Sequence, residues 1–174
     1  AQHLALVLDI LRTNNYFARL HKCCFAEASI EFLGHVISEN QIAMDPTKVQ
    51  AVNDWPTPTT VRHVRPFLGL ARYYCRFIDH FASIAAPITD LTSHDKHGIQ
   101  TYWDDACTDS FTVLKKAMTS APCLALPDLS LPFEVYTDSS KIAIGAVILQ
   151  CPSPQAELHP ICFLSRKHPH AVLK

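Results

Sequence analysis

The sequence predicts an α+β fold, and three features carry that prediction. From Leu4 the apolar residues follow the i, i+3, i+4, i+7 spacing of an amphipathic helix. Between Glu31 and Met44 two apolar segments flank a polar turn, which indicates a β-hairpin. A second hairpin is predicted where an apolar run from Phe133 is followed by a turn and by another apolar run that ends at Leu149.

The first helix should end near Asn14-Asn15, because asparagine is a poor helix residue. Residues 19–25 are predicted to be extended. The hairpin that follows should turn at residues 38–40. Asp45-Pro46 then predicts a short helix that runs through Asp54, since Asp is a good N-cap and Pro suits the first turn.

A proline-rich linker, Trp55–Thr60, marks a boundary. Its last residue, a threonine, can cap a helix over residues 61–74. Pro66 lies inside that helix, where it costs roughly 3 kcal/mol unless the helix bends. Helical spacing continues over residues 77–91 and is interrupted by Pro87.

Polar residues 93–100 are predicted to form a loop. The next helix should start at Asp104-Asp105, because acids suit the first turn, and should stop at Pro122. A turn-rich connector over residues 126–131 leads to the second hairpin. Ile161–Ser165 should add a third strand, which we expect to form an edge of the sheet or to expose apolar surface.

Composition excludes several classes of protein. The net charge of −1 argues against strong independent binding to nucleic acid, which usually requires a basic excess. Seven cysteines without a C-x-x-C pair fit neither a disulfide framework nor a zinc ribbon, so we expect reduced thiols and an intracellular setting. A membrane span is not expected, because apolar runs of about 18 residues are absent. A signal peptide is not expected either, because Ala1-Gln2-His3 carries no cationic segment and the apolar residues after it are periodic.

Four segments share their order and spacing with a known family: Phe32–Ser38, Val61–Ile78, Leu114–Pro122 and Phe133–Ser140. Together they resemble the reverse transcriptase and RNase H polyproteins of gypsy-type retrotransposons. The first segment resembles the primer-grip hairpin at the end of the polymerase palm, and the second resembles the thumb. The third and fourth resemble the passage into the RNase H domain and its opening strand.

This resemblance implies three regions. Residues 1–55 would be the end of the palm, with one helix and the primer-grip hairpin. Residues 56–100 would be a helical thumb. Residues 101–174 would hold a connecting helix and an incomplete, antiparallel RNase H-like sheet.

Asp138 is placed by an apolar run at the start of a Ser139-Ser140 turn, and a carboxylate on a strand is costly unless it is paired or binds a cation. By resemblance Asp138 is the first catalytic, metal-binding acid of RNase H, a nuclease that uses two Mg²⁺ ions. A single carboxylate is a poor magnesium site. Glu134 is about 13 Å away along the strand, too far to share a metal. The alternative is that Asp138 only caps the turn.

The segment Tyr102-Trp103-Asp104-Asp105 satisfies the Tyr-x-Asp-Asp pattern of polymerase metal ligands. That motif needs the tip of an apolar hairpin, whereas here a polar loop precedes the pattern and a helix follows it. We therefore interpret Asp104 as a helix cap. The polymerase motif itself is expected upstream of Ala1.

The primer-grip resemblance assigns contacts with a template–primer duplex or an RNA–DNA hybrid to Phe32, Leu33, Gly34 and His35. The alternative is a core hairpin with a packing glycine. Thumb residues that could meet phosphates are Arg62, Arg65 and Arg72, together with Arg76 and Lys48. The alternative for these cations is a solvated helix face.

Two functions remain open from the sequence. The chain is either a fragment of a polyprotein that copies RNA into DNA and hydrolyses the RNA of hybrids, or a non-catalytic nucleic-acid-binding or scaffold protein. Pro66 and Gln41 favour the second, because the family usually has a small polar residue and a glycine there. We expect the chain alone to be inactive, since the other RNase H acids should lie beyond Lys174. We also expect self-association through an exposed sheet edge.

Overall fold

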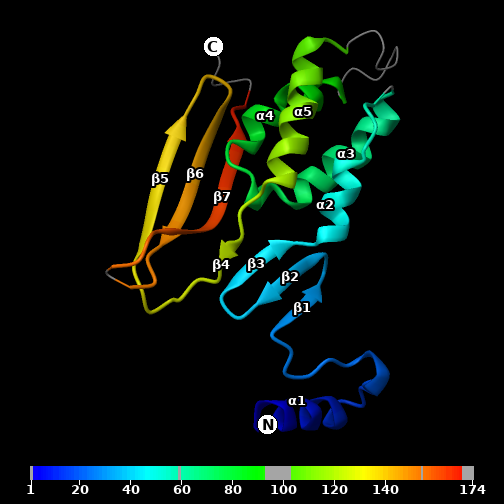
Figure 1. The fold of residues 1–174 in the computed structure, drawn as a ribbon, viewed down its shortest axis with the longest axis vertical. Helices are drawn as coiled ribbons and strands as arrows, with labels where there is room; N and C mark the ends of the chain where they lie inside the picture. Colours follow the sequence, from blue (N-terminus) through cyan, green and yellow to red (C-terminus); the bar gives the residue numbers. More distant parts are fainter. Residues whose placement is uncertain (1, 59, 93–102, 154, 170–174) are drawn as a thin grey trace.

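The computed structural model describes residues 2–58, 60–92, 103–153 and 155–169. It confirms an α+β fold in which the helices after residue 45 lie above one antiparallel sheet and beside a second one, while the N-terminal helix lies below the first sheet (Figure 1). The helices are α1 (Gln2–Thr13), α2 (Pro46–Asn53), α3 (Val61–Tyr73), α4 (Phe81–Leu91) and α5 (Asp105–Thr119). The predicted loop at residues 93–100 falls outside the described residues.

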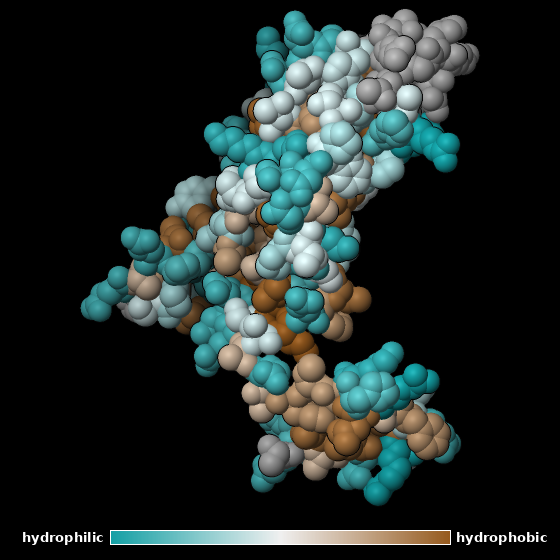
Figure 2. Space-filling model, turned by 45° about the vertical axis from the view of Figure 1, so that its right-hand side comes forward, coloured by the Kyte–Doolittle hydropathy of each residue, from teal (hydrophilic) through white to brown (hydrophobic). Residues whose placement is uncertain are grey.

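Helix α1 ends at Thr13, as predicted from the two asparagines that follow it. None of its side chains is buried, and Leu6 is 60% exposed. Figure 2 shows hydrophobic side chains gathered on the lower part of the molecule, over this helix. The extended conformation predicted for residues 19–25 is wrong in part, because Leu20–Lys22 form a turn of 3-10 helix, η1. No helix in the described ranges has the length and apolar character needed to cross a bilayer.

The first sheet has the strand order β1-β2-β3-β4, and every neighbouring pair is antiparallel. Its strands are β1 (Ser29–Phe32), β2 (His35–Ser38), β3 (Gln41–Met44) and β4 (Leu124–Ala125). The β2–β3 hairpin was predicted, but β1 and β4 were not. No residue of the β2–β3 turn has a positive φ, so Asn40 is not left-handed and the turn is reshaped.

Side-chain caps start the next helices where the sequence predicts them. The Asp45 carboxylate accepts a hydrogen bond from the Thr47 amide at 2.8 Å at the start of α2. Helix α3 is continuous through Pro66, and α4 is continuous through Pro87. The interruption predicted at Pro87 is therefore wrong. The chain instead breaks at the short 3-10 turn η2 (Cys75–Phe77) and at His80, whose φ of 51° is left-handed.

The hydrophobic core lies between α2, α3, α4 and α5. The ring of Phe67 on α3 packs against that of Phe111 on α5, with centroids 4.7 Å apart. The same core includes Val52 before the proline-rich linker and Leu124 after α5. The division at residues 55 and 100 stays a prediction.

The second sheet has the predicted three antiparallel strands, in the order β5-β6-β7. They are β5 (Phe133–Ser139), β6 (Ala143–Gln150) and β7 (His159–Lys167). The third strand, β7, packs on η2 and α4, where the Ser165 hydroxyl accepts a hydrogen bond from the Ala82 amide at 2.8 Å. As predicted, β7 is an edge of this sheet, and its Leu164 is 46% exposed. The other edge is β5, and every residue of β5 is exposed.

Candidate functional site

The turn between β1 and β2 presents two apolar side chains to solvent. Leu33 and Gly34 have φ values of 48° and 73°, the positive φ at both central residues that a type I′ hairpin turn requires. Gly34 adopts this conformation freely, whereas it costs Leu33 roughly 1–2 kcal/mol. Phe32 is 57% exposed and Leu33 is 72% exposed. The strained turn therefore holds its apolar residues outward.

The C-terminal end of α3 holds this turn from behind. The Tyr74 hydroxyl donates a hydrogen bond to the Gly34 carbonyl at 2.5 Å, and the Tyr73 hydroxyl donates one to the Leu33 carbonyl. The Asp45 amide donates a second bond to the Gly34 carbonyl at 3.2 Å. Burial raises the pKa of Tyr74 to about 12, so its hydroxyl stays a donor at neutral pH.

His35 belongs to the packing behind the turn. Its ring centroid lies 5.3 Å from that of Tyr73, 5.4 Å from Tyr74 and 5.7 Å from Phe77. A Cβ added to Gly34 would lie 3.1 Å from the Tyr74 hydroxyl, so Gly34 also has the packing role considered for it. Of the four residues predicted at the turn, Phe32 and Leu33 are therefore the exposed ones.

Two of the three predicted arginines line one groove. Arg65 and Arg72 on α3 border a hollow of about 290 Å³, which is also lined by Thr89 on α4 and by Thr92 just after α4. Gly69 lies between the arginines, and apart from its chain neighbours and the nearby α3 backbone no atom lies within 4 Å of the place where its Cβ would be. The groove is therefore open beside the helix at this point.

Arg62 lies elsewhere. It lines a separate hollow with Trp55, Pro58, His63 and Pro66, over the proline-rich linker. Arg65 and Arg72 therefore lie in the same groove, whereas Arg62 lies in a different hollow.

Asp138 is exposed on β5 and pairs with Gly145 of β6. The turn after β5 is held by Ser140 rather than by Asp138. The Ser140 hydroxyl accepts hydrogen bonds from the amides of Ile142 and Ala143, both at 3.1 Å. The capping alternative for Asp138 thus has no support in the contacts of this turn.

The surroundings of Asp138 do not assemble a metal centre. In the part of the chain that the structure describes, no three His, Cys, Asp or Glu side chains gather closely enough to hold a metal ion. Glu134 on the same strand accepts a hydrogen bond from the Tyr136 hydroxyl at 2.8 Å, and this bond raises the pKa of Tyr136. The described residues therefore do not fit a pair of Mg²⁺ ions.

Asp104 caps α5, as the sequence predicts. Its carboxylate accepts a hydrogen bond from the Cys107 amide at 2.9 Å, and the bonds from Cys107 lower the pKa of Asp104. Trp103 donates from its indole nitrogen to the Thr108 hydroxyl at 2.9 Å. The Asp104-Asp105 pair lies at a helix start and not at a hairpin tip.

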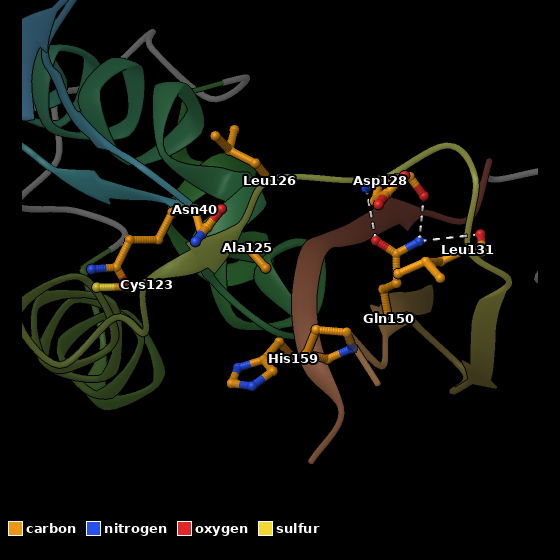
Figure 3. Close-up of a pocket in the computed structure, with 10 residues that line it drawn as sticks. Asn40, Cys123, Ala125, Leu126, Asp128, Leu131, Gln150 and His159 are labelled. Atoms are coloured by element: carbon orange, nitrogen blue, oxygen red, sulfur yellow. Dashed lines mark hydrogen bonds between the residues drawn. The ribbon is translucent and has the colours of Figure 1, made fainter. Parts of the chain in front are cut away.

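A cavity of about 420 Å³ is lined by residues of both sheets and of the connector between them, and sequence reasoning did not predict it (Figure 3). The buried Gln150 forms its floor beside Asp128 and Leu131. The Gln150 carboxamide accepts a hydrogen bond from the Asp128 amide at 2.9 Å and donates to the Asp128 carbonyl at 2.8 Å (Figure 3). Gln150 thus fixes the connector between the sheets, and all of its polar atoms are engaged.

Sequence reasoning also missed Gly69, Tyr73 and Tyr74. A glycine in a helix interior is itself a signal, because it costs stability unless a close approach requires it. The two tyrosines offered no comparable signal, since a tyrosine at helical spacing usually means core packing.

Comparison with known proteins shows consistent similarities. Residues 103–174 match the family described as the RNase H-like domain found in reverse transcriptase. The chain is 36% identical over 173 residues to the retrovirus-related Pol polyprotein from transposon opus of Drosophila melanogaster, covering 95% of this chain and 17% of the polyprotein. It is 36% identical over 174 residues to the Pol polyprotein from transposon gypsy, covering 95% of this chain and 16% of that protein.

A shorter relative is an uncharacterized mitochondrial protein of Arabidopsis thaliana. It is 39% identical over 133 residues, which cover 75% of this chain and 82% of that protein. The chain spans about a sixth of the length of the transposon polyproteins.

Solved structures share the fold. The foamy viral protease-reverse transcriptase in complex with an RNA/DNA hybrid superposes with a TM-score of 0.78 at 19% identity, over 99% of this chain and 23% of that one. The same enzyme in complex with dsDNA gives a TM-score of 0.77 at 19% identity, over 100% of this chain and 36% of that one.

Proposed function

Because this chain belongs to the reverse transcriptase and RNase H polyproteins of retrotransposons, we propose that it grips a nucleic-acid duplex for such a polyprotein. The duplex is a template–primer or an RNA–DNA hybrid. The whole polyprotein would carry out RNA-directed DNA synthesis and hydrolysis of the RNA in hybrids. The chain alone would bind the duplex and would neither extend a primer nor cleave RNA.

One observation carries this proposal, namely that α3 joins the apolar turn to the arginine groove. Eight residues separate Arg65 from Tyr73, which corresponds to about 12 Å along a helix axis at 1.5 Å per residue. Arginine donates to phosphate in a planar fork, while the exposed Phe32 and Leu33 suit the apolar edges of sugars and bases. The two contacts thus lie within the reach of a few nucleotides.

The net charge of the chain determines how tightly we expect it to bind a duplex. A net charge of −1 supplies no general attraction for phosphate, so local contacts have to carry the binding. Weak and salt-dependent affinity is the consequence. The foamy viral reverse transcriptase complexes that share this fold contain RNA/DNA hybrid or dsDNA, which supports a duplex as the ligand.

Asp138 has a subordinate part in the proposal. RNase H enzymes use divalent metal ions, and Asp138 would be one magnesium ligand in a complete domain. The described residues do not gather further acids around it. We accordingly assign no hydrolytic step to this chain.

The proposal keeps the three regions inferred from the resemblance. Residues 1–55 contribute the palm end with its turn, and residues 56–100 contribute the thumb with its groove. Residues 101–174 open the RNase H-like domain. The shared core between the first two regions supports their acting together on one duplex.

Fluorescence anisotropy with a labelled 20-base-pair RNA–DNA hybrid tests the binding. The Arg65→Gln/Arg72→Gln variant should weaken affinity and should reduce the slope of log K against log salt by about 1.8, the value for two phosphate contacts. Arg166→Gln is the matched control, because Arg166 is an exposed arginine on β7. A chain that binds no hybrid at low salt, or a double variant with an unchanged slope, would contradict the proposal.

A second candidate is a stand-alone, non-catalytic binding or scaffold protein. The short Arabidopsis relative, of which this chain covers 82%, favours it. A hybrid-cleavage assay with Mg²⁺ and the Asp138→Asn variant tests whether the chain is catalytic at all. Cleavage that disappears in the variant would restore a nuclease, whereas binding without cleavage agrees with both non-catalytic readings.

A further inference from the structure

We infer that Tyr73 and Tyr74 are positioning residues that fasten the duplex-facing turn to α3, so that the turn and the arginine groove act as one rigid surface. The inference rests on the proposed duplex binding for its functional consequence. Its structural part, the rigidity of the turn, stands independently of any ligand.

The turn between β1 and β2 needs an external support. It is a two-residue loop with Leu33 held at a φ of 48°, a conformation that is unfavourable for any residue with a Cβ. Its β1 strand is short and fully exposed, and β1 is an edge of its sheet. Neither local conformation nor burial of β1 therefore fixes the turn.

Both carbonyls of the turn accept a hydrogen bond from the C-terminal end of α3. Tyr73 and Tyr74 are adjacent on the helix, and their hydroxyls reach Leu33 and Gly34, each 40 residues away in the chain. Their rings meet edge to face with centroids 4.9 Å apart. Tyr74 is only 1% exposed, so its hydroxyl has no freedom to bond water instead.

Gly34 fits closely against the two tyrosines. A Cβ at Gly34 would lie 3.1 Å from the Tyr74 hydroxyl and 3.8 Å from a ring carbon of Tyr73. The missing side chain thus lets the backbone of the turn lie directly on the two tyrosines. A turn that is held at this distance moves with α3.

The consequence for binding is a fixed spacing. A duplex that contacts Arg65 and Arg72 would find Phe32 and Leu33 already in place, without the entropic cost of ordering the turn. Loosening the turn should therefore reduce the contribution of Leu33 to the affinity for the duplex and leave the contribution of Arg72 to that affinity unchanged. A merely structural role of the tyrosines would weaken both contributions alike.

The Tyr73→Phe/Tyr74→Phe variant tests this inference, because it removes the two hydroxyls and keeps the rings. The variant should fold, since the Gly34 carbonyl keeps its bond from the Asp45 amide. Tyr136→Phe is the matched control, because it also loses one hydroxyl hydrogen bond, the bond to Glu134 on β5. Hydrogen exchange measured by mass spectrometry should be faster over residues 30–37 by about threefold to tenfold in the double variant and unchanged in the control.

Affinity for the labelled hybrid gives the second readout. Leu33→Ala should weaken binding in the wild-type background and have little further effect in the double-Phe background, whereas Arg72→Gln should weaken binding equally in both. Unchanged exchange at the turn overturns the inference. So does a Leu33→Ala effect of equal size in both backgrounds. If the wild type binds no hybrid, the proposed function fails, and the exchange measurement alone still decides whether the tyrosines fasten the turn.

Discussion

The imidazole of His80 covers Gly145, so that a Cβ on Gly145 would lie only 3.1 Å from the His80 Nδ1 atom. His80 precedes α4 with a left-handed φ of 51°, and Gly145 lies in the middle strand of the second sheet beside Asp138. The contact therefore fixes how the helical layer rests on the strand that neighbours the candidate acid.

Gly145→Ala should lower the free energy of unfolding by about 1 kcal/mol, because the added methyl group overlaps the His80 ring. Because the His80 side chain is 47% exposed, it can move away from the added methyl group, so the loss of stability stays small. In a His80→Asn background the same substitution should cost much less, since asparagine tolerates a positive φ and is smaller. Urea unfolding of the four proteins measures the coupling. Equal costs in both backgrounds would rule out the contact as the cause.

Asp104→Ala should lower the melting temperature more than Asp105→Ala does, because only Asp104 accepts the capping hydrogen bond from Cys107. Asp104→Asn should retain the cap. The folded-state pKa of Asp104 is lowered, so its contribution to stability is complete above the unfolded pKa, near 4, and is lost as the pH falls through the lower folded value. Melting curves between pH 2 and pH 7 should therefore lose part of their acid sensitivity in Asp104→Asn. An unchanged melt of Asp104→Ala at pH 7 would argue against the cap.

Local signals explain what the sequence predicted well. The caps at Asp45, Thr60 and Asp104 depend on one side chain and the next few amides, and all three occur in the structure. Pro87 was misread because packing of α4 against α5 and β7 outweighs the local cost of a proline in a helix.

Contacts between distant segments explain the rest. Strand β4 has two residues, and only its pairing with Gln41 and Ile42 makes it a strand. At the candidate site, the assignment of the four turn residues and the arginines to a nucleic-acid duplex stays a prediction. Their division into exposed Leu33 and packed His35, and the grouping of Arg65 with Arg72, depend on where α3 and α4 come to lie.

Cys107 should be the slowest of the described cysteines to react with a disulfide reagent at pH 8. Its side chain is 3% exposed, and burial raises the pKa of its thiol to about 11, so almost no thiolate forms at that pH. Cys24 and Cys123 are exposed and should react fast. Mass spectrometry of labelled peptides over time gives the rates, and labelling in urea is the control. Early labelling of Cys107 in the folded protein would contradict the buried position.

Pro66→Ala should raise the free energy of unfolding by roughly 1–3 kcal/mol. The substitution restores a backbone donor in the interior of α3 and removes the ring clash with the preceding turn, while the greater freedom of the unfolded chain offsets a part of the gain. Pro46→Ala is the matched control, because Pro46 lies at the first position of α2, where the missing amide has no partner to lose. Pro46→Ala should therefore not raise the free energy of unfolding. A Pro66→Ala variant no more stable than the wild type would show that α3 accommodates the proline without strain.

The chain should associate with itself as its concentration rises, because β5 is an open edge whose strand is exposed along its whole length. On one face of the sheet Phe133, Val135, Ile144 and Leu164 are each at least 41% exposed. Sedimentation velocity between micromolar and hundred-micromolar concentrations measures the association.

Two lysine variants locate the surface. Val135→Lys places a charge on the apolar face and should weaken association by at least about fivefold, whereas Tyr136→Lys places the same charge on the opposite face of the same strand and should weaken it less. Equal effects of the two variants would instead indicate pairing through the backbone edge, which both lysines approach alike. A wild-type chain that stays monomeric over the whole range would mean that the exposed apolar side chains of β5 are too few to hold two copies together.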